Sequence, residues 1–313
     1  MKTHFKRSSS RGFTLIELMV AMAITTIIVT VLVSITSVAL GTWNRSRSEL
    51  RAARQAKATF DFIVRDFESL VTRSGGDAEW LSALAPAPLP GNSSLKSSNA
   101  AELVFFTVAG DRYNGQNGAT TTDKPGDISC VGYALRYQDP ILGSSGTFKT
   151  FSLNRLLIDP DKTYTDVLGK NDLSTAFTSY KTKLESPESF VAENIYQFTI
   201  SFNVQVIKQV SGSSPQMLNA SVRLGPSEVA GVSTASFRIT GAGLKTLASS
   251  TTPTITNDEI KAGRVTAMEI SMTVLSDMGI DQLRNRTFTP AQQAEFLTKN
   301  SYQFSKLVQL PSP

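Results

Sequence analysis

The chain has 313 residues, of which 41% are hydrophobic and 18% are charged, and its formal net charge is +5. The basic excess is local, because residues 1–12 hold four of the 31 Lys and Arg side chains and none of the 26 Asp and Glu side chains. The remaining 27 cations leave a net charge of only +1. A nearly neutral chain lacks the basic surface that binds a phosphate backbone, so no nucleic-acid partner is expected.

The histidine and cysteine content limits the available chemistry. The single histidine, His4, lies in the basic N-terminal stretch, and the single cysteine, Cys130, lies in an apolar run that is typical of a strand. If the N-terminal stretch is removed, no imidazole remains, which excludes Ser–His and Cys–His catalysis and most zinc sites. We therefore interpret Cys130 as a small buried hydrophobe. No enzymatic activity is expected, and a membrane-tethered enzyme is the disfavoured alternative.

A long uncharged segment follows the basic stretch. Residues 18–40 are 23 consecutive residues without a charge, a glycine or a proline. As an α-helix this segment would be roughly 34 Å long, enough to cross the hydrocarbon core of a bilayer. Trp43 and Arg45 follow at the place of an interfacial anchor. A secretory signal peptide has a much shorter apolar region, of roughly 7–15 residues. We therefore predict a transmembrane helix over residues 13–40.

Glu17 distinguishes this helix from a plain membrane anchor. A carboxylate one turn into a membrane helix is costly unless it finds a partner. If the chain is cleaved after Gly12, the new α-ammonium group of Phe13 lies at a similar depth. Glu17 of one subunit can then pair with Phe13 of a neighbour, which predicts an assembly role for the carboxylate. Gly12 has no side chain, so a protease can draw the backbone close to its catalytic groups.

Residues 12–21, with the sequence GFTLIELMVA, resemble the processing signature of class III (prepilin) signal peptides. The resemblance implies that residues 1–12 are a leader, that a prepilin peptidase cleaves after Gly12, and that it methylates Phe13. It also implies a single-pass protein of the inner membrane with a cytoplasmic N-terminus and a periplasmic head. The implied partners are other pilin or pseudopilin subunits, which contact the N-terminal helix.

The helix is predicted to continue beyond the membrane. Residues 43–73 contain no proline or glycine, and Gly75 and Gly76 provide a helix stop. Apolar side chains recur at steps of three and four residues, which predicts an amphipathic helix over residues 41–74. The predicted core face consists of Leu50, Ala53, Ala56, Phe60, Ile63, Phe67 and Leu70.

Strand-like segments dominate residues 75–313, the predicted head. Residues 82–100 are rich in Ala, Pro, Ser and Asn and are predicted to form a linker. Thr289 is predicted to cap a short helix over residues 290–298. The predicted strands cover residues 102–108, 128–137, 148–157, 195–207, 236–240, 265–274 and 304–310. A long helix followed by many strands predicts a pilin-like α+β fold, with the helix packed on an antiparallel sheet.

Short segments narrow the resemblance to particular filament subunits. Residues 51–56 and 63–66 resemble the helix of J-type minor pseudopilins of type II secretion and of PilW-type minor pilins. Residues 131–135 and 192–200 resemble strands of those families, and the order of the elements resembles the prepilin-type Verru_Chthon cassette protein C family. The resemblance implies a structural minor pilin or pseudopilin of a type IV pilus or type II secretion filament. A filament-tip adhesin or cargo-recognition module is the alternative.

Two acidic segments contain the oxygen atoms that calcium prefers as ligands. One holds Asp159, Asp161 and Asp166, and the other holds Asp and Asn residues between positions 111 and 127. Neither follows the spacing of an EF-hand, and Asp and Asn favour turns through their own local hydrogen bonds. We therefore predict solvated turns rather than a metal site, and no cofactor.

Overall fold

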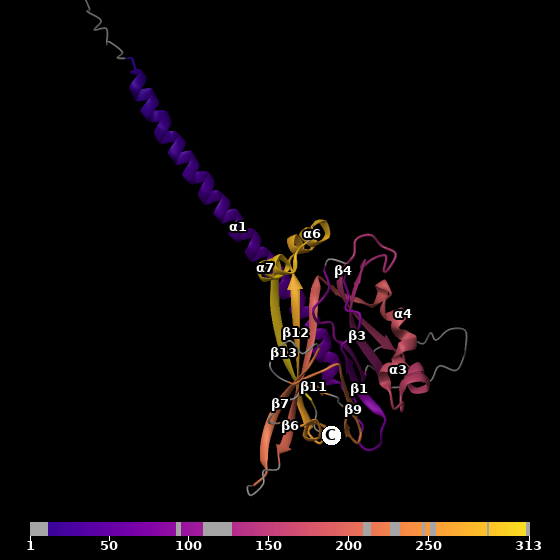
Figure 1. Ribbon diagram of the computed structural model, residues 1–313. Helices are drawn as coiled ribbons and strands as arrows, with labels where there is room; N and C mark the ends of the chain where they lie inside the picture. The colour runs from indigo at the N-terminus through magenta and orange to yellow at the C-terminus, as the bar shows by residue number, and fades with distance from the viewer. Residues whose placement is uncertain are drawn as a thin grey trace, which may run out of the picture. The chain divides into compact units, whose positions relative to one another are not determined.

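The structure is a computed structural model that describes residues 12–91, 95–108, 127–208, 214–225, 232–245, 248–250, 255–286 and 288–310. The chain divides into two units, Met1–Leu50 and Arg51–Pro313. Helix α1 (Leu15–Glu68) is 54 residues long and contributes its first part to the first unit and its last part to the second (Figure 1).

The second unit contains strands and short helices. The strands are β1 (Glu79–Leu84), β2 (Glu102–Val108), β3 (Ile128–Gln138), β4 (Thr150–Ile158), β5 (Phe190–Glu193), β6 (Ile195–Lys208), β7 (Gln216–Leu224), β8 (Val232–Thr234), β9 (Ser236–Thr240), β10 (Gly243–Leu244), β11 (Ala248–Ser250), β12 (Arg264–Leu275) and β13 (Ser301–Gln309). The helical elements are α2 (Pro160–Lys162), η2 (Thr163–Val167), α3 (Leu173–Phe177), η3 (Thr178–Tyr180), α4 (Lys181–Leu184), η4 (Pro187–Ser189), α5 (Asn257–Lys261), α6 (Asp277–Asn285) and α7 (Pro290–Asn300).

The strands form two sheets. The seven-stranded sheet has the order β10-β9-β1-β2-β3-β4-β5, and the six-stranded sheet has the order β11-β8-β7-β6-β12-β13. The paired strands are antiparallel except β7 and β8, which are parallel. Figure 1 shows α3 and α4 beside the seven-stranded sheet, on the side away from β12 and β13. The predicted α+β class is confirmed, although the expected single sheet is in fact two.

Aromatic side chains join the helix and the two sheets in one core. Phe67 of α1 stacks on Phe105 of β2, with ring centroids 4.1 Å apart. Phe202 of β6 stacks on Phe237 of β9 with centroids 3.9 Å apart, so a strand of each sheet contributes to this contact. Both pairs belong to one buried hydrophobic cluster. Such stacked pairs add to the stabilisation from burial alone.

The amphipathic part of α1 buries one face in this core, as its periodicity predicts. Leu50 was expected on the core face but is 59% exposed. The buried face of α1 therefore begins only after this residue. The buried residues of α1 are Ala52, Ala56, Thr59, Phe60, Ile63, Asp66 and Phe67.

Helix α1 ends at Glu68, before the expected end at residue 74. The following residues turn alongside β2, where the Val71 N–H donates to the Phe106 carbonyl at 2.9 Å and the Val108 N–H donates to the Ser69 carbonyl at 2.8 Å. These bonds satisfy backbone groups that would otherwise continue the helix. The predicted extension to residue 74 is therefore wrong, and the tertiary pairing explains why.

The expected strands are found close to their predicted positions, but the predicted linker over residues 82–100 is wrong in part. Residues 82–84 belong to β1, which pairs with both β2 and β9. Leu95 and Ala100 are buried, and the Ser97 hydroxyl donates to the Tyr196 carbonyl at 2.5 Å. The segment is therefore packed into the head along much of its length. The predicted helix near residue 290 is α7, with Thr289 in a capping box.

A buried ion pair connects α1 to the seven-stranded sheet. The Arg155 guanidinium of β4 donates to both carboxylate oxygens of Asp66, at 2.7 Å each. The Tyr133 hydroxyl of β3 donates to the same carboxylate at 2.5 Å, and the Thr107 hydroxyl of β2 donates to the Asp66 carbonyl at 2.8 Å. One helical residue thus contacts three adjacent strands. Burial, together with the Asp66 carboxylate, raises the pKa of Tyr133 well above its ordinary value, so its hydroxyl keeps its proton.

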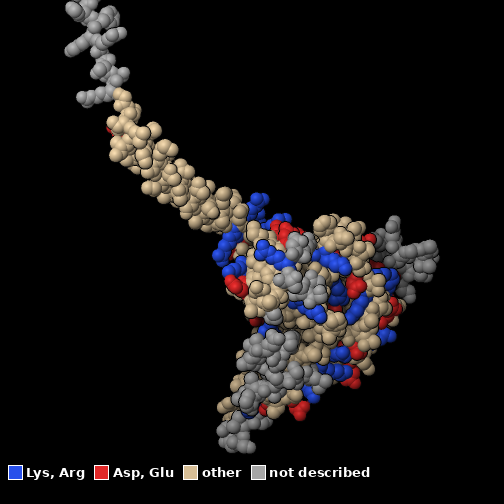
Figure 2. Space-filling view, turned by 45° about the horizontal axis from the view of Figure 1, so that its top comes forward, with Lys and Arg blue, Asp and Glu red and all other residues tan. Residues whose placement is uncertain are grey.

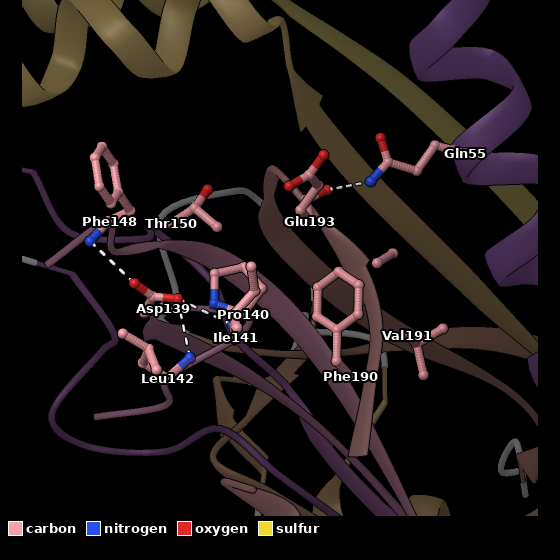
Figure 3. Close-up of a pocket in the computed structure, with 11 residues that line it drawn as sticks. Gln55, Asp139, Pro140, Ile141, Leu142, Phe148, Thr150, Phe190, Val191 and Glu193 are labelled. Atoms are coloured by element: carbon pink, nitrogen blue, oxygen red, sulfur yellow. Dashed lines mark hydrogen bonds between the residues drawn. The ribbon is translucent and has the colours of Figure 1, made fainter. Parts of the chain in front are cut away.

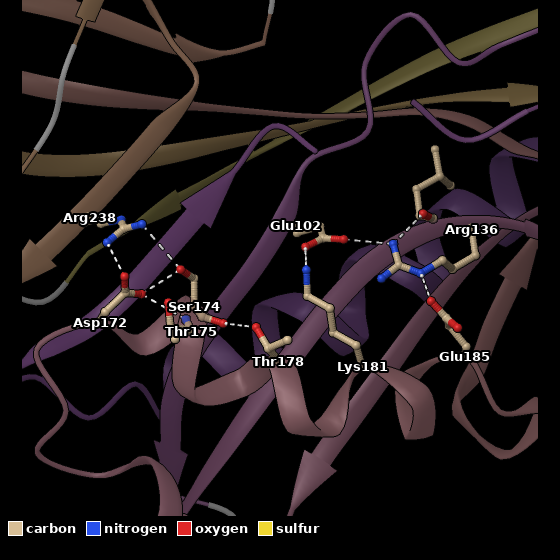
Figure 4. A network of polar contacts seen from close by, with 10 residues as sticks. Glu102, Arg136, Asp172, Ser174, Thr175, Thr178, Lys181, Glu185 and Arg238 are labelled. Carbon is tan, nitrogen blue, oxygen red and sulfur yellow. Dashed lines mark hydrogen bonds and ion pairs between the residues drawn. The ribbon is translucent and has the colours of Figure 1, made fainter. Parts of the chain in front are cut away.

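The opposite face of this sheet carries a second polar network (Figure 4). Glu102 of β2 accepts from Arg136 of β3 at 2.9 Å and from Lys181 of α4 at 3.1 Å. Arg238 of β9 pairs with Asp172, the N-cap residue of α3, at 3.1 Å. These pairs hold the short helices on the sheet. Burial disfavours the charged form of Glu102, but the two cations outweigh it, so the pKa of this carboxyl lies below its ordinary value.

Candidate functional site

The predicted processing site lies directly before α1. Gly12, Phe13 and Thr14 precede the helix, and the Phe13 side chain is 89% exposed. The sequence-based assignment of cleavage after Gly12 and methylation of Phe13 remains a prediction. The exposed, non-helical backbone at this point is compatible with access by a protease.

Thr14 and Glu17 form a capping arrangement at the N-terminus of α1. The Glu17 carboxylate accepts from the Thr14 N–H at 2.9 Å and from the Thr14 hydroxyl at 2.8 Å. In return, the Glu17 N–H donates to the Thr14 hydroxyl oxygen at 3.3 Å. This reciprocal pattern satisfies backbone donors that a helix start leaves free. Thr14 is therefore a candidate positioning residue for Glu17.

Thr14 was not among the residues predicted from the sequence, although its signal was present. A Thr followed three residues later by a Glu, directly before an apolar helix, is the pattern of a capping box. Both Thr14 bonds go to Oε2 of Glu17, and among the described residues Oε1 has no hydrogen-bond partner. The proposed pairing of Glu17 with Phe13 of a neighbour remains a prediction. The free oxygen means that capping and pairing are compatible.

The first unit is an apolar helical surface. Every large apolar side chain described from Phe13 to Leu40 is at least 51% exposed. Figure 2 shows this part of the helix covered almost entirely by uncharged residues, with Lys and Arg gathered after it. By length and composition, α1 is the one helix in the described part of the chain that could cross a membrane. It fits a single-pass membrane anchor.

Threonine hydroxyl groups within this segment form hydrogen bonds to carbonyl groups of their own helix. The hydroxyls of Thr25, Thr26, Thr30 and Thr36 each donate to the carbonyl four residues earlier, at 2.7 to 2.8 Å. A polar hydroxyl can therefore lie among hydrocarbon without an unpaired donor. The threonines do not argue against a membrane position for the helix.

Cys130 is buried in β3, as the sequence predicts. It has no exposed surface, and burial raises the pKa of its thiol above its ordinary value. Its backbone N–H donates to the Thr163 hydroxyl at 2.9 Å. A protonated, inaccessible thiol is a poor nucleophile, which supports the interpretation of Cys130 as a packing residue.

The acidic segment considered for calcium is helical rather than a loop. Asp159 precedes α2, Asp161 lies in α2, and Asp166 lies in the π-helical turn η2. The Tyr180 hydroxyl donates to Asp166 at 2.5 Å, and this bond lowers the pKa of that carboxyl. Among the described residues, no group of three or more His, Cys, Asp or Glu side chains could hold a metal ion. Of the second acidic segment, only Asp127 lies within the described residues.

One comparison with known proteins bears on the N-terminal prediction. Residues 7–33 match the family model described as the prokaryotic N-terminal methylation motif. No curated protein sequence is significantly similar to that of the chain. A solved type IV-like pilin from Thermus thermophilus is similar over 83% of this chain and 97% of that chain, with 12% sequence identity and a TM-score of 0.28. The match to the methylation motif confirms that the chain carries the class III signal peptide of prepilin-type proteins.

Proposed function

We propose that the chain is a structural minor pilin or pseudopilin, processed after Gly12 and incorporated into a type IV pilus or type II secretion filament. The observation that supports this most directly is the methylation motif over residues 7–33, joined to a helical surface on which the apolar side chains are at least half exposed. Such a surface requires lipid or other helices around it. The membrane provides the lipid before assembly, and the filament core provides the other helices afterwards.

Assembly depends in this proposal on the carboxylate of Glu17. Its Oε2 caps α1 through Thr14, while Oε1 accepts from the α-ammonium group of Phe13 in a neighbouring subunit. A charge-assisted bond in a low-dielectric environment is stronger than one in water. The pair also fixes the axial register of two stacked helices, because only one offset brings the two groups together.

The head is proposed to be non-enzymatic, anchored from the inner membrane with the N-terminus in the cytoplasm. Two features support the first point: the only histidine of the sequence is His4, in the predicted leader, and the Cys130 thiol is buried. The proposed orientation rests on the resemblance to class III signal peptides, whose processing requires a cytoplasmic N-terminus.

Mass spectrometry of the membrane-extracted chain tests the proposal. The expected mature N-terminus is N-methylated Phe13, and an intact Met1 terminus would contradict it. Cleavage after Ala39 would also contradict it, because residues 37–39 resemble the small-x-small site of a secretory signal peptide. Glu17→Ala is expected to permit cleavage but to reduce recovery of the chain in sheared filament fractions. Recovery equal to that of the wild type would refute the pairing of Glu17 with Phe13.

A further inference from the structure

An exposed apolar patch surrounds an open pocket beside β5, the end strand of the seven-stranded sheet (Figure 3). The pocket has a volume of about 700 Å³, and its walls come from α1, from β5 and from the loop between β3 and β4. The loop contributes three apolar side chains, Ile141, Leu142 and Phe148, which are 80%, 63% and 70% exposed. Phe190 of β5 lines the same pocket and is 37% exposed. Grouped apolar side chains of this kind mark a binding surface for a protein or for a membrane.

The backbone N–H groups of the apolar loop residues are bonded within the loop. The buried carboxylate of Asp139 accepts from the N–H groups of Ile141 at 2.9 Å, Leu142 at 3.1 Å and Phe148 at 3.1 Å (Figure 3). The Gly143 N–H donates to the Asp139 carbonyl at 2.8 Å. The loop therefore presents apolar side chains outward while these donors are satisfied inside. Water does not require such an arrangement, but a hydrocarbon environment does, because it offers no partner to a backbone donor.

The patch lies at the end of the head where the chain arrives from the apolar segment. Arg51 is the first residue of the second unit, and its guanidinium pairs with Asp277 at the start of α6. Asp277 accepts from the Asn194 amide at 3.1 Å, and the Thr150 hydroxyl, at the base of the loop, donates to Asn194 at 2.9 Å. These contacts connect the point of entry with the loop. Met278, next to Asp277, adds an apolar side chain that is 58% exposed.

The length of the chain limits how far this end of the head can lie from a membrane. Leu40 ends the uncharged segment, and Arg51 follows it by eleven residues within α1. At a rise of about 1.5 Å per residue, this part of the helix is roughly 16 Å long. The headgroup layer itself extends about 5–7 Å beyond the hydrocarbon core. When the apolar segment spans the membrane, the lipid surface is therefore a partner within reach of every anchored copy, whatever the tilt of α1.

Charge does not select the partner of the patch. The charged side chains in or next to its elements have both signs, and two of them, Arg51 and Asp277, neutralise each other. The cations are Arg51, Arg54 and Lys149, and the acids are Glu185, Glu188, Glu193 and Asp277. A surface of mixed charge suits zwitterionic headgroups, and the apolar side chains provide the driving force. Binding is therefore expected to depend little on salt or on lipid charge.

We propose that the loop between β3 and β4 inserts Ile141, Leu142 and Phe148 into the headgroup layer of the membrane that α1 crosses, so that the head docks on the lipid surface before assembly. The inference rests on the proposed function as a membrane-anchored filament subunit, and it adds a second membrane contact to that of α1. The loop belongs to the second unit, so this contact is separate from the membrane-spanning segment. A docked subunit enters a filament only when the loop leaves the lipid, and the patch therefore opposes the step from membrane to filament.

Fluorescence quenching of the full-length chain in phosphatidylcholine vesicles tests the inference. A fluorophore on Ser144→Cys reports on the loop without replacing an inserting side chain, since Ser144 is an exposed residue between Leu142 and Phe148. Native Cys130 is buried and does not compete for the label. The matched control is Ser74→Cys, at an exposed serine beyond the C-terminal end of α1. Lipids that carry a nitroxide near the headgroup are expected to quench the loop label several-fold more strongly than the control label.

A variant of the patch shows whether the apolar side chains cause the docking. Ile141→Ser, Leu142→Ser and Phe148→Ser together, in the loop-labelled chain, are expected to reduce quenching to the level of the control label. Tyr164→Ser is the matched control variant, because it removes a 74% exposed aromatic side chain of η2 that lies outside the pocket, and it should leave quenching unchanged. Protection of Cys130 from the fluorophore shows that each variant is folded, because this thiol is buried in the core.

Equal quenching of the loop and control labels would contradict docking, and quenching that survives the triple variant would show that other residues contact the lipid. Docking that requires phosphatidylglycerol and disappears at high salt would be electrostatic and would contradict apolar insertion. A loop label that is shielded in filaments but not in vesicles would assign the patch to a protein partner instead.

Carbonate extraction of the same samples separates this inference from the proposed function. A chain that resists extraction but shows no quenching of the loop label contradicts the docking of the head alone. A chain that carbonate extracts from the vesicles contradicts the membrane anchor, and with it the proposed function.

Discussion

Asp66 and Arg155 are 89 residues apart in the chain, and their side chains form a two-bond ion pair that joins α1 to β4. Tyr133 also bonds both side chains, but neither charge is balanced without the other, because both groups are largely removed from water. The pair therefore stabilises the head mainly by avoiding an unpaired buried charge.

Asp66→Asn is expected to lower the free energy of unfolding by about 3 kcal/mol, because Arg155 would keep its charge without a carboxylate. Urea unfolding of the full chain in detergent, followed by Trp fluorescence, measures the change. Asp61→Asn is the matched control, since Asp61 is an exposed acid of the same helix, and it should stay within about 0.5 kcal/mol of the wild type. A loss equal to that of the control would show that the ion pair contributes little.

The Glu102 network should make stability depend on pH. The folded pKa of Glu102 lies below the ordinary value of 4.5, so its contribution is complete above that value and is lost as the pH falls through the lower folded pKa. Glu102→Gln should therefore destabilise the head at pH 7 and flatten the decline in stability below about pH 5. Thermal unfolding from pH 3 to 7 measures this. Glu188→Gln removes an exposed carboxylate and should leave the profile unchanged.

Thr14→Ala should loosen the first turn of α1, because the Glu17 N–H loses its side-chain acceptor. Loss of such a cap costs about 1 kcal/mol, which corresponds to about fivefold faster hydrogen exchange. The amides of residues 15–18 in the full chain report the change. Thr36→Val is the control, since the Thr36 hydroxyl is a donor to a carbonyl rather than a cap. Equal hydrogen-exchange rates in the wild type and in Thr14→Ala would contradict the capping role of Thr14.

Cys130 should resist maleimide labelling in the folded chain and react once the chain is unfolded. Burial both blocks access and raises the pKa of the thiol, and the thiolate is the reactive form. Labelling across a urea series should follow the unfolding curve. The Leu142→Cys variant provides an exposed reference thiol that labels at once. Fast labelling of native Cys130 would contradict its burial and would complicate any cysteine-labelling experiment.

Much of the fold could be predicted from local patterns. The alternation over residues 195–207 marks β6 because a strand has a period of two, and the step of three and four residues marks Phe60, Ile63 and Phe67 on α1. β1 was missed because its six residues run into an Ala- and Pro-rich stretch that resembles a linker. Its strand character comes from pairing with β2 and β9, which no short window contains.

The same distinction between local patterns and contacts between distant residues holds for the sites. Gly12, Phe13, Glu17 and the unnoticed Thr14 lie within six residues, so a local motif carries the whole arrangement. Asp66 could be recognised as a helix residue, but its partner Arg155 is far away in sequence. The apolar pocket is less predictable still, since it depends on how Asp139 folds one loop beside the end of β5.

The buried face of α1 also has a mechanical consequence. Residues from Ala52 to Phe67 contact the head in a row along the helix axis, with the Asp66–Arg155 pair near its end. A tension applied along α1 therefore acts on these contacts in shear, so that many must yield together rather than one after another. A subunit built in this way resists extraction by its helix more strongly than its folding stability alone would suggest.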